Sequence, residues 1–289
     1  MRASLDTHKT YVSGRAIEAI LPSVWAESVR QRCGEIGGRE RELLERLFFV
    51  GRHNNYTSVL PADDHPGTRL RSWQCFYELE MDAAQTYASR FFGDTCFCPV
   101  RGFPQVQPGD DVVIIGSQVA NSSTRALLGG TRRRDPAFLI AHDGWRTELH
   151  WNLVTPENAP FTTITDFRGL RKSFAHAIYE RGRASPYESL IHPTEARYLD
   201  DYLLVTALPI EKGSKPRVLV LSGLHGAGSR AVDLILREPP RDLLEKAVHQ
   251  TAGSEYFQLL IHVETTPDRR GELMPSHPEL VEARALVVD

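Results

Sequence analysis

The sequence predicts an α/β fold, in which a mixed, largely parallel sheet carries two duplicated strand-loop-helix units and follows an all-α N-terminal domain. Two observations predict this fold. A short apolar run leads into a loop of small residues twice, in residues 112–126 and 217–231. Near residue 100 the apolar pattern also changes from a period of about 3.6 residues to short β-branched runs. We therefore expect a helical domain over residues 1–100 and an α/β ligand-binding domain over residues 101–289.

The first domain is expected to consist of helices. Apolar residues recur every three or four positions from Ile17 to Val29, as they do along the buried stripe of one helix. A second helix is expected over residues 40–50, and a third, rich in aromatic residues, over residues 72–92. We expect these helices to pack against the rest of the chain or across a homo-oligomer.

The second domain is expected to alternate strands with helices. The run from Val112 to Ile115 is typical of a strand covered on both faces. Asp143-Gly144 favours a tight hairpin turn between strands at 137–141 and 146–154. Further elements are expected in crossover order: strands at 202–208 and 217–221, helices at 229–237 and 241–251, and a last strand at 256–264. Residues 155–201 are expected to form a long functional loop.

A repeated motif marks the candidate binding site. In residues 112–126 and again in 217–231, an apolar strand leads into a Gly/Ser loop that ends in Ser/Thr-Arg-Ala at a helix start. Unpaired N–H groups and the positive helix end suit such a turn to an anion, and an arginine forks onto phosphate or carboxylate. An anionic small molecule, such as a nucleotide derivative, is predicted to contact Gly116, Ser117, Asn121, Ser122, Thr124, Arg125, Gly223, His225, Gly226, Gly228, Ser229 and Arg230.

Other interpretations of the two loops stay open. Neither loop contains G-x-G-x-x-G or Gly-Lys-Ser/Thr, so neither fits a dinucleotide fingerprint or a Walker loop. Both loops can also be structural turns kept after a duplication. His225 is the titratable group of the second loop, where Ser229 is the expected N-cap of the helix. As an acid or base, His225 would act with one carboxylate from Glu188, Glu195, Asp200 or Asp201.

No metal site is expected, and the sequence names no cofactor. His142, His150 and His192 lack the spacing of a recognised metal motif and are expected on solvated loops. The four cysteines fall in the first third of the chain, where their spacing fits neither a disulfide framework nor a zinc site. We expect reduced thiols at Cys33, Cys75, Cys96 and Cys98.

Composition argues against a nucleic-acid or membrane partner. The net charge is −3 and the pI is about 6.4, so no global positive field attracts nucleic acid. The longest basic run, Arg132 to Arg134, is typical of a solvated loop. The N-terminus has no apolar signal region, and no apolar stretch of about 18 residues occurs, so a cytoplasmic protein is expected.

Around the two loops and residues 256–264, the chain resembles the Rossmann-like sensor and nucleotide-processing domains of bacterial regulatory and anti-phage systems. The resemblance covers residues 108–265 and includes the nucleoside deoxyribosyltransferase-like folds. It implies a Rossmann-like sheet and a nucleotide-derived ligand. The catalytic glutamate of the deoxyribosyltransferase-like enzymes has no matching position here, so cleavage of a glycosidic bond is not implied.

Three functions follow from these observations. The first is a binding or sensor protein whose two loops hold the anionic ligand. The second is an enzyme that cleaves a nucleotide or nucleoside with His225 as acid or base, so the question of catalysis stays open. The third is a DNA-binding regulator that uses helices between Ile17 and Val50, where arginines and glutamates are mixed.

Overall fold

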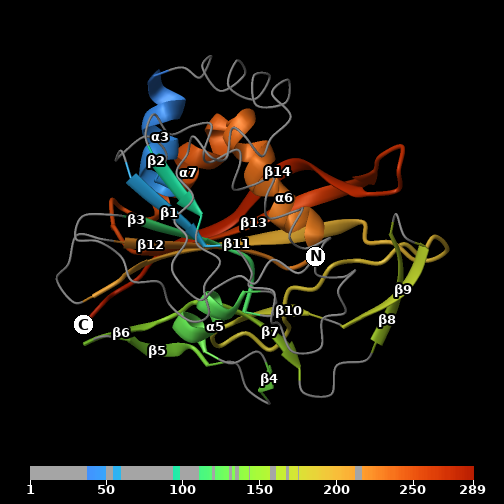
Figure 1. Ribbon diagram of the computed structural model, residues 1–289, viewed down its shortest axis with the longest axis horizontal. Coiled ribbons are helices and arrows are strands. Elements are labelled where there is room, and N and C mark those ends of the chain that lie inside the picture. Colours follow the sequence, from blue (N-terminus) through green and yellow to red (C-terminus); the bar gives the residue numbers. More distant parts are fainter. Residues whose placement is uncertain are drawn as a thin grey trace, which may run out of the picture.

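A seven-stranded sheet forms the centre of the protein (Figure 1). The computed structural model describes residues 38–49, 55–59, 94–97, 111–118, 121–129, 132–133, 137–142, 144–156, 161–166, 169–174, 176–211 and 217–289. The strands of the sheet, in spatial order, are β14 (Leu273–Ala285), β13 (Phe257–Pro267), β11 (Asp200–Pro209), β12 (Arg217–Gly223), β3 (Asp111–Ile115), β1 (Asn55–Val59) and β2 (Asp94–Phe97).

The sheet is mixed, and its longer part is antiparallel. Strands β12, β3, β1 and β2 run parallel to one another. Strands β11, β13 and β14 pair antiparallel and have 10, 11 and 13 residues, whereas β1, β2 and β3 have four or five. The predicted largely parallel, Rossmann-like sheet is therefore wrong. Apolar runs predict that strands exist, but they carry no information about strand direction.

In the part of the chain that the structure describes, three helices cover one face of this sheet: α3 (Gly38–Phe48), α6 (Gly226–Arg237) and α7 (Arg241–Gln250) (Figure 1). They bury a core that includes Leu44 and Phe48 of α3 and Ile235 of α6 against inward residues such as Val205 of β11 and Leu219 of β12. Strands β12 and β13 run in the same direction, because both are antiparallel to β11. The predicted crossover is confirmed, with α6 and α7 joining these two strands.

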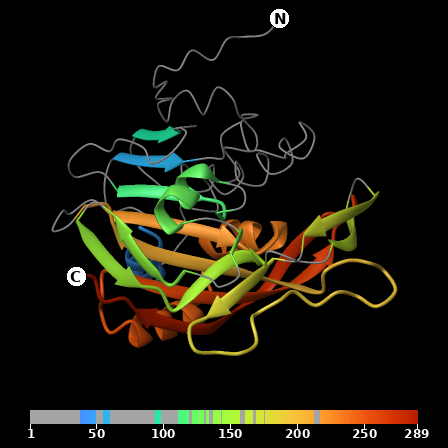
Figure 2. The ribbon, with the colours of Figure 1, turned by 90° about the horizontal axis from the view of Figure 1, so that it is seen from below.

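The opposite face is covered by a short helix and small sheets (Figures 1 and 2). The helix is α5 (Ser122–Leu128). The strands of this layer are β4 (Arg132–Arg133), β5 (Leu139–His142), β6 (Trp145–Glu148), β7 (Trp151–Pro156), β8 (Phe161–Asp166), β9 (Gly169–Phe174) and β10 (Ala177–Glu180). They form the sheets β5-β6, β8-β9 and β10-β7-β4. Helices therefore lie on one side of the central sheet and mainly strands on the other.

The predicted all-α N-terminal domain is wrong. Strands β1 and β2 belong to the first hundred residues, and both join the parallel part of the central sheet through β3. The sequence of β1, Asn-Tyr-Thr-Ser-Val, is short and mostly polar, so it contains no apolar run that would have predicted a strand. Helix α3 confirms the helix expected over residues 40–50. The helices expected from Ile17 to Val29 and over residues 72–92 lie outside the described residues, and the domain boundary near residue 100 stays a prediction.

Most strands and helices expected in the second half are present. The hairpin β5-β6 has Gly144 at a φ of 84°, which is the positive φ that its tight turn requires. The region expected as one long loop, 155–201, instead contains β8, β9 and β10. Strand β14 was missed because Pro275 and Pro278 interrupt the strand signal. In the part of the chain that the structure describes, no helix is long and apolar enough to cross a membrane.

Candidate functional site

The two predicted loops start side by side. The first loop, residues 116–121, follows β3, and the second loop, residues 223–225, leads from β12 into α6. Strands β3 and β12 are parallel neighbours, with Ile115 opposite Leu221, and the Gly116 N–H donates a hydrogen bond to the Leu221 carbonyl at 2.8 Å. The duplicated motif therefore places both of its loops at one edge of the sheet, at the carboxyl ends of two adjacent strands.

From this edge the two following helices diverge to opposite faces. Leu127 of α5 packs with Val112 and Val220, whereas Val232 of α6 packs with Val113 and Leu219 on the other face. When two neighbouring parallel strands are followed by helices on opposite faces of the sheet, their carboxyl ends form a topological switch point. Open α/β sheets commonly bind ligands there. We call this region the strand-end site: the two loops together with Ser222, the residue before the last of β12.

The first loop is closed by hydrogen bonds within itself. The Asn121 side-chain amide donates to the Ile115 carbonyl at 2.9 Å, and the Thr124 hydroxyl donates to the Gly116 carbonyl at 2.7 Å. Arg125 Nε donates to the Gln118 carbonyl at 2.9 Å. Ser117 is buried, and Ser122 is the first residue of α5. Gly116 has a φ of 114°, which allows the sharp exit from β3.

The second loop is shorter than predicted, because α6 begins at Gly226 and not near Ser229. His225 is the N-cap, with extended backbone angles, and the Ser229 N–H donates to the His225 carbonyl at 3.3 Å inside the first turn. A Cβ at Gly228 would collide with the Tyr202 carbonyl, and one at Gly223 would collide with the Ser229 amide nitrogen. Gly228 is therefore required for the close packing of α6 on β11, and Gly223 for the close approach of the end of β12 to the first turn of α6.

A buried carboxylate holds the start of α6. Asp201 of β11 is fully buried and accepts hydrogen bonds from the N–H groups of Tyr202 at 2.8 Å, His225 at 3.0 Å and Gly228 at 2.6 Å. Burial raises the pKa of Asp201 to about 7, although these three bonds oppose the rise. The sequence named Asp201 only as one of four partners for His225. Its contact with His225 is to the backbone amide.

Both predicted arginines have partners inside the protein. Arg230 lies 2.6 Å from the Glu272 carboxylate and also contacts the Met274 sulfur at 2.8 Å. Arg125 bonds the first loop through Nε, as described above. The side chains of Arg230 and Glu272 are only 14% and 22% exposed, so this ion pair is well shielded from water. The arginines contribute to the structure of the site before any ligand enters.

Two buried polar atoms at the strand-end site lack a hydrogen-bond partner among the described residues: Gln118 Oε1 and Ser222 Oγ. Gln118 and Ser222 are 1% and 2% exposed. The Gln118 amide nitrogen donates to Asn152 Oδ1 at 2.6 Å, which places the side chain toward β7. Each unpartnered buried atom costs about 1–3 kcal/mol and calls for a physical explanation. Sequence analysis missed both residues, because satisfaction of a hydrogen bond is a property of the folded chain.

Aromatic rings line the second loop. The His225 imidazole stacks on the Tyr198 ring at 3.9 Å with an angle of 14° between the planes, and His176 lies 5.8 Å from it. Burial lowers the pKa of His176 to about 4, so this ring is neutral at physiological pH. Three segments of the chain therefore meet at His225: the residues before β10, those before β11 and the start of α6.

The other predicted titratable residues are dispersed. Asp200 Oδ2 lies 3.2 Å from His262 Nε2, and this bond raises the pKa of His262 despite partial burial. His192 lies 3.7 Å from Glu195 in the segment before β11, where Glu188 is exposed. In the ranges that the structure describes, no three metal-ligating side chains converge on one point.

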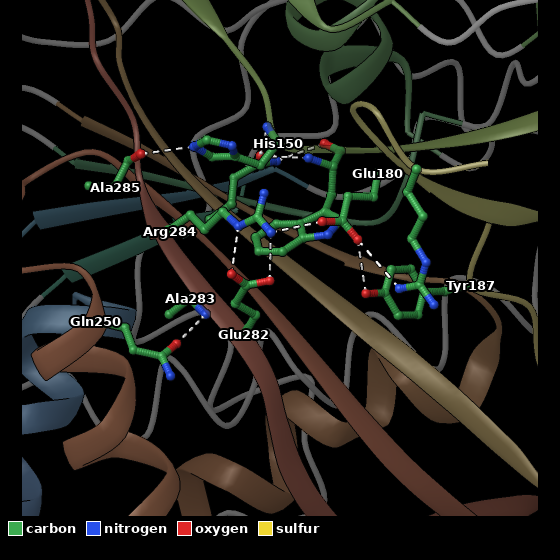
Figure 3. A network of polar contacts seen from close by, with 11 residues as sticks. His150, Glu180, Tyr187, Gln250, Glu282, Ala283, Arg284 and Ala285 are labelled. Carbon is green, nitrogen blue, oxygen red and sulfur yellow. Dashed lines mark hydrogen bonds and ion pairs between the residues drawn. The ribbon is translucent and has the colours of Figure 1, made fainter. Parts of the chain in front are cut away.

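A separate polar network fastens the strand layer to the sheet (Figure 3). Arg284 of β14 bonds Glu180 of β10 at 2.8 Å and Glu282 at 2.7 Å. Tyr187 donates a hydrogen bond to Glu180 at 3.1 Å, and the Arg284 guanidinium lies over the Trp151 ring. Each charged group in this network has a partner of opposite charge, so we assign it a structural role.

Comparison with protein-family models, curated proteins and solved structures gives no match. The resemblance to sensor and nucleotide-processing domains thus stays a prediction. Function must be argued from the site itself.

Proposed function

We propose that this protein binds a small polar molecule at the strand-end site. The observation that carries the proposal is the pair of unpartnered atoms, Gln118 Oε1 and Ser222 Oγ, at a topological switch point. Both lie on the face that α5 and β7 cover. Ser222 stands opposite Leu204, which packs with Trp151 of β7, and Gln118 bonds Asn152 of the same strand. Both atoms therefore call for a hydrogen-bond partner on this face.

The chemistry of these two atoms limits the ligand. A glutamine Oε1 only accepts hydrogen bonds, and a serine hydroxyl both donates and accepts. A ligand with an N–H or O–H donor next to an acceptor matches this pair, as hydroxylated rings and amides do. The rings of His225 and Tyr198 at the second loop favour a planar portion in the same molecule. A nucleoside-like compound has all three features.

A thermal-shift screen with mass spectrometry tests this proposal. Purified full-length protein is heated with nucleosides, nucleotides, NAD, ADP-ribose and phosphosugars, and each mixture is then analysed for altered compounds. We expect a hit that raises Tm in the wild type and raises it much less in Gln118→Met, which removes the acceptor, together with the donor to Asn152, but keeps the side-chain volume. A hit with unaltered ligand supports binding alone.

A control variant separates loss of ligand contact from loss of stability. Ser254→Ala removes a hydroxyl that donates to the Tyr256 carbonyl at 2.7 Å, away from the strand-end site. It should lower Tm without reducing the ligand-induced shift. The proposal fails if no compound shifts the wild type, or if Gln118→Met keeps the full shift.

Cleavage of the bound compound is the second candidate function. His225 favours it, because this titratable residue is half-buried and lies at the start of α6 in the second loop. In this case mass spectrometry would detect a product that disappears in His225→Ala. Unaltered product formation in that variant would remove His225 from any catalytic role.

A further inference from the structure

Asp201 occupies the position in which an anionic ligand would bind the start of α6. The N-terminus of a helix attracts anions because its first N–H groups lack partners within the helix and the dipole is positive there. Here the N–H groups of His225 and Gly228 both point to the Asp201 carboxylate, at 3.0 Å and 2.6 Å. The protein thus supplies its own anion at the end of α6.

The backbone fixes this arrangement from both sides. Asp201 is the second residue of β11, and its carboxylate also accepts the Tyr202 N–H. Gly228 brings α6 so close that a Cβ would collide with the Tyr202 carbonyl. The neighbouring Asp200 faces the opposite side of the sheet, where it bonds His262 and the Leu190 N–H. The carboxylate of Asp201 is therefore sealed between β11 and α6, and a ligand cannot displace it without separating the two elements.

The charges near this carboxylate do not favour a second anion. Arg230, in the first turns of α6, is paired with Glu272 and shielded from water. The rings closest to the loop are His225 and Tyr198, with His176 behind them. Asp200 adds a further negative charge on the adjacent residue. The charged groups nearest the start of α6 are therefore the Asp201 carboxylate and an arginine whose terminal nitrogen is already paired with Glu272.

We propose that Asp201 makes the strand-end site select uncharged ligands, because its carboxylate occupies the start of α6, where a ligand phosphate would otherwise bind. This inference rests on the proposed function and deepens it. It selects a nucleoside-like compound over the corresponding nucleotide. The negative charge predicted for the ligand from the sequence then has no binding position at the start of α6.

Removal of the carboxylate should convert this end into an anion site. In Asp201→Ala the N–H groups of His225 and Gly228 lose their acceptor, and a small anion can occupy the vacated space. The experiment measures Tm at pH 8 with sodium formate, inorganic phosphate or sodium chloride at equal ionic strength. We expect a lowered Tm in Asp201→Ala, recovered in large part by formate and not by chloride, while phosphate and chloride act alike on the wild type.

Asp268→Ala is the matched control. Its carboxylate also accepts two backbone N–H groups, from Arg270 and Glu272, both at 2.8 Å, but it is exposed, so water replaces it. We expect no formate effect there. If Asp201→Ala does not fold, Asp201→Asn is measured against phosphate in the same way, since the amide oxygen preserves part of the cap.

The outcomes separate this inference from the proposed function. Stabilisation of the wild type by phosphate beyond chloride, or equal formate effects in the Asp201 and Asp268 variants, would overturn the inference. Formate recovery confined to Asp201→Ala, with no uncharged hit in the ligand screen, would instead refute the proposed function and leave the role of Asp201 as an internal anion intact.

Discussion

The geometry of the second loop depends on the carboxylate of Asp201. It has no contact with water and is held by three backbone amides, two of them at the start of α6. Each such bond to a charged acceptor is worth about 1.5–3 kcal/mol, and burial of the charge opposes this gain. The balance is seen in the pKa of Asp201, which burial raises from 3.8 to about 7.

This shift predicts a specific pH dependence of stability. Between pH 3.8 and about 7 the folded protein keeps a proton on Asp201 that the unfolded chain has lost. The contribution of Asp201 to the free energy of unfolding is therefore greatest below the unfolded pKa and declines as pH rises through the folded pKa, by about 4 kcal/mol in total. We expect the difference between wild type and Asp201→Asn, measured by urea unfolding from pH 4 to 8, to follow this decline.

The comparison with Asp201→Asn isolates one group among several that titrate in this range. His176, with a lowered pKa, and His262, with a raised pKa, are present in both proteins and cancel in the difference. A difference in unfolding free energy that stays constant across this pH range would contradict the raised pKa of Asp201.

Removal of the Ser222 hydroxyl is predicted to stabilise the protein, because this hydroxyl is buried without a partner among the described residues. Replacing an unpartnered polar atom by a methyl hydrogen removes a desolvation cost, so Ser222→Ala should raise the free energy of unfolding of the ligand-free protein by about 1 kcal/mol. Urea unfolding of the two proteins measures this change. A loss of stability in Ser222→Ala would show that the hydroxyl has a structural partner.

At the scale of elements, the close contact of α6 with β11 keeps the second loop in place. It depends on Gly228, since a side chain there would collide with the Tyr202 carbonyl. The helix packs through Val232, Ile235 and Leu236, but its first turn is positioned by this backbone contact and by Asp201. The start of α6, and with it His225, is therefore held against β11 by Gly228 and Asp201.

Gly228→Ala tests this packing. We expect it to lower the free energy of unfolding by about 3 kcal/mol, as overpacking in a rigid contact does, and to abolish the ligand-induced shift. Gly38→Ala is the control, because a Cβ at Gly38 in α3 has nothing within 4 Å. Urea unfolding of both variants gives the comparison. Equal effects of the two substitutions would rule out a required close approach of α6 and β11.

At the scale of the whole molecule, the central sheet has a parallel part, whose strands β3 and β12 end at the strand-end site, and an antiparallel part beside it. Strands β3 and β12 present their loops at one edge. Beyond them, β11, β13 and β14 pair over long antiparallel registers, and the Arg284 network ties the strand layer to β14 (Figure 3). The switch point thus lies where the parallel and antiparallel parts meet.

Much of this arrangement was open to prediction from the sequence. Strands β3, β11, β12 and β13 are apolar runs, and α6 and α7 show helical periodicity, so their existence was predicted. The duplicated motif also predicted that the two loops belong together. Strand direction was not predictable, because the apolar runs of β11 and β12 do not show whether the two strands pair parallel or antiparallel. The predicted sheet type was therefore wrong.

The site itself was predictable only in outline. His225 lies in the second loop as predicted, but Gly228 lies in the first turn of α6, and the reason for this glycine is the approach of β11, which is distant in sequence. Asp201 and Ser222 belong to strands whose pairing decides what their side chains meet. Asp201 and His225 are 24 positions apart in the sequence, so they cannot be assigned as partners without the fold.

The affinity of a hit ligand for the wild type and for Ser222→Ala tests the central claim most directly. Isothermal titration of both proteins with the uncharged hit from the screen gives the two Kd values. Because Ser222→Ala should leave the ligand-free protein folded and more stable, a higher Kd in the variant reports a lost contact. We predict a Kd about tenfold higher or more, equivalent to about 1.4 kcal/mol. Equal Kd values would place the ligand away from the carboxyl ends of β3 and β12 and contradict the account.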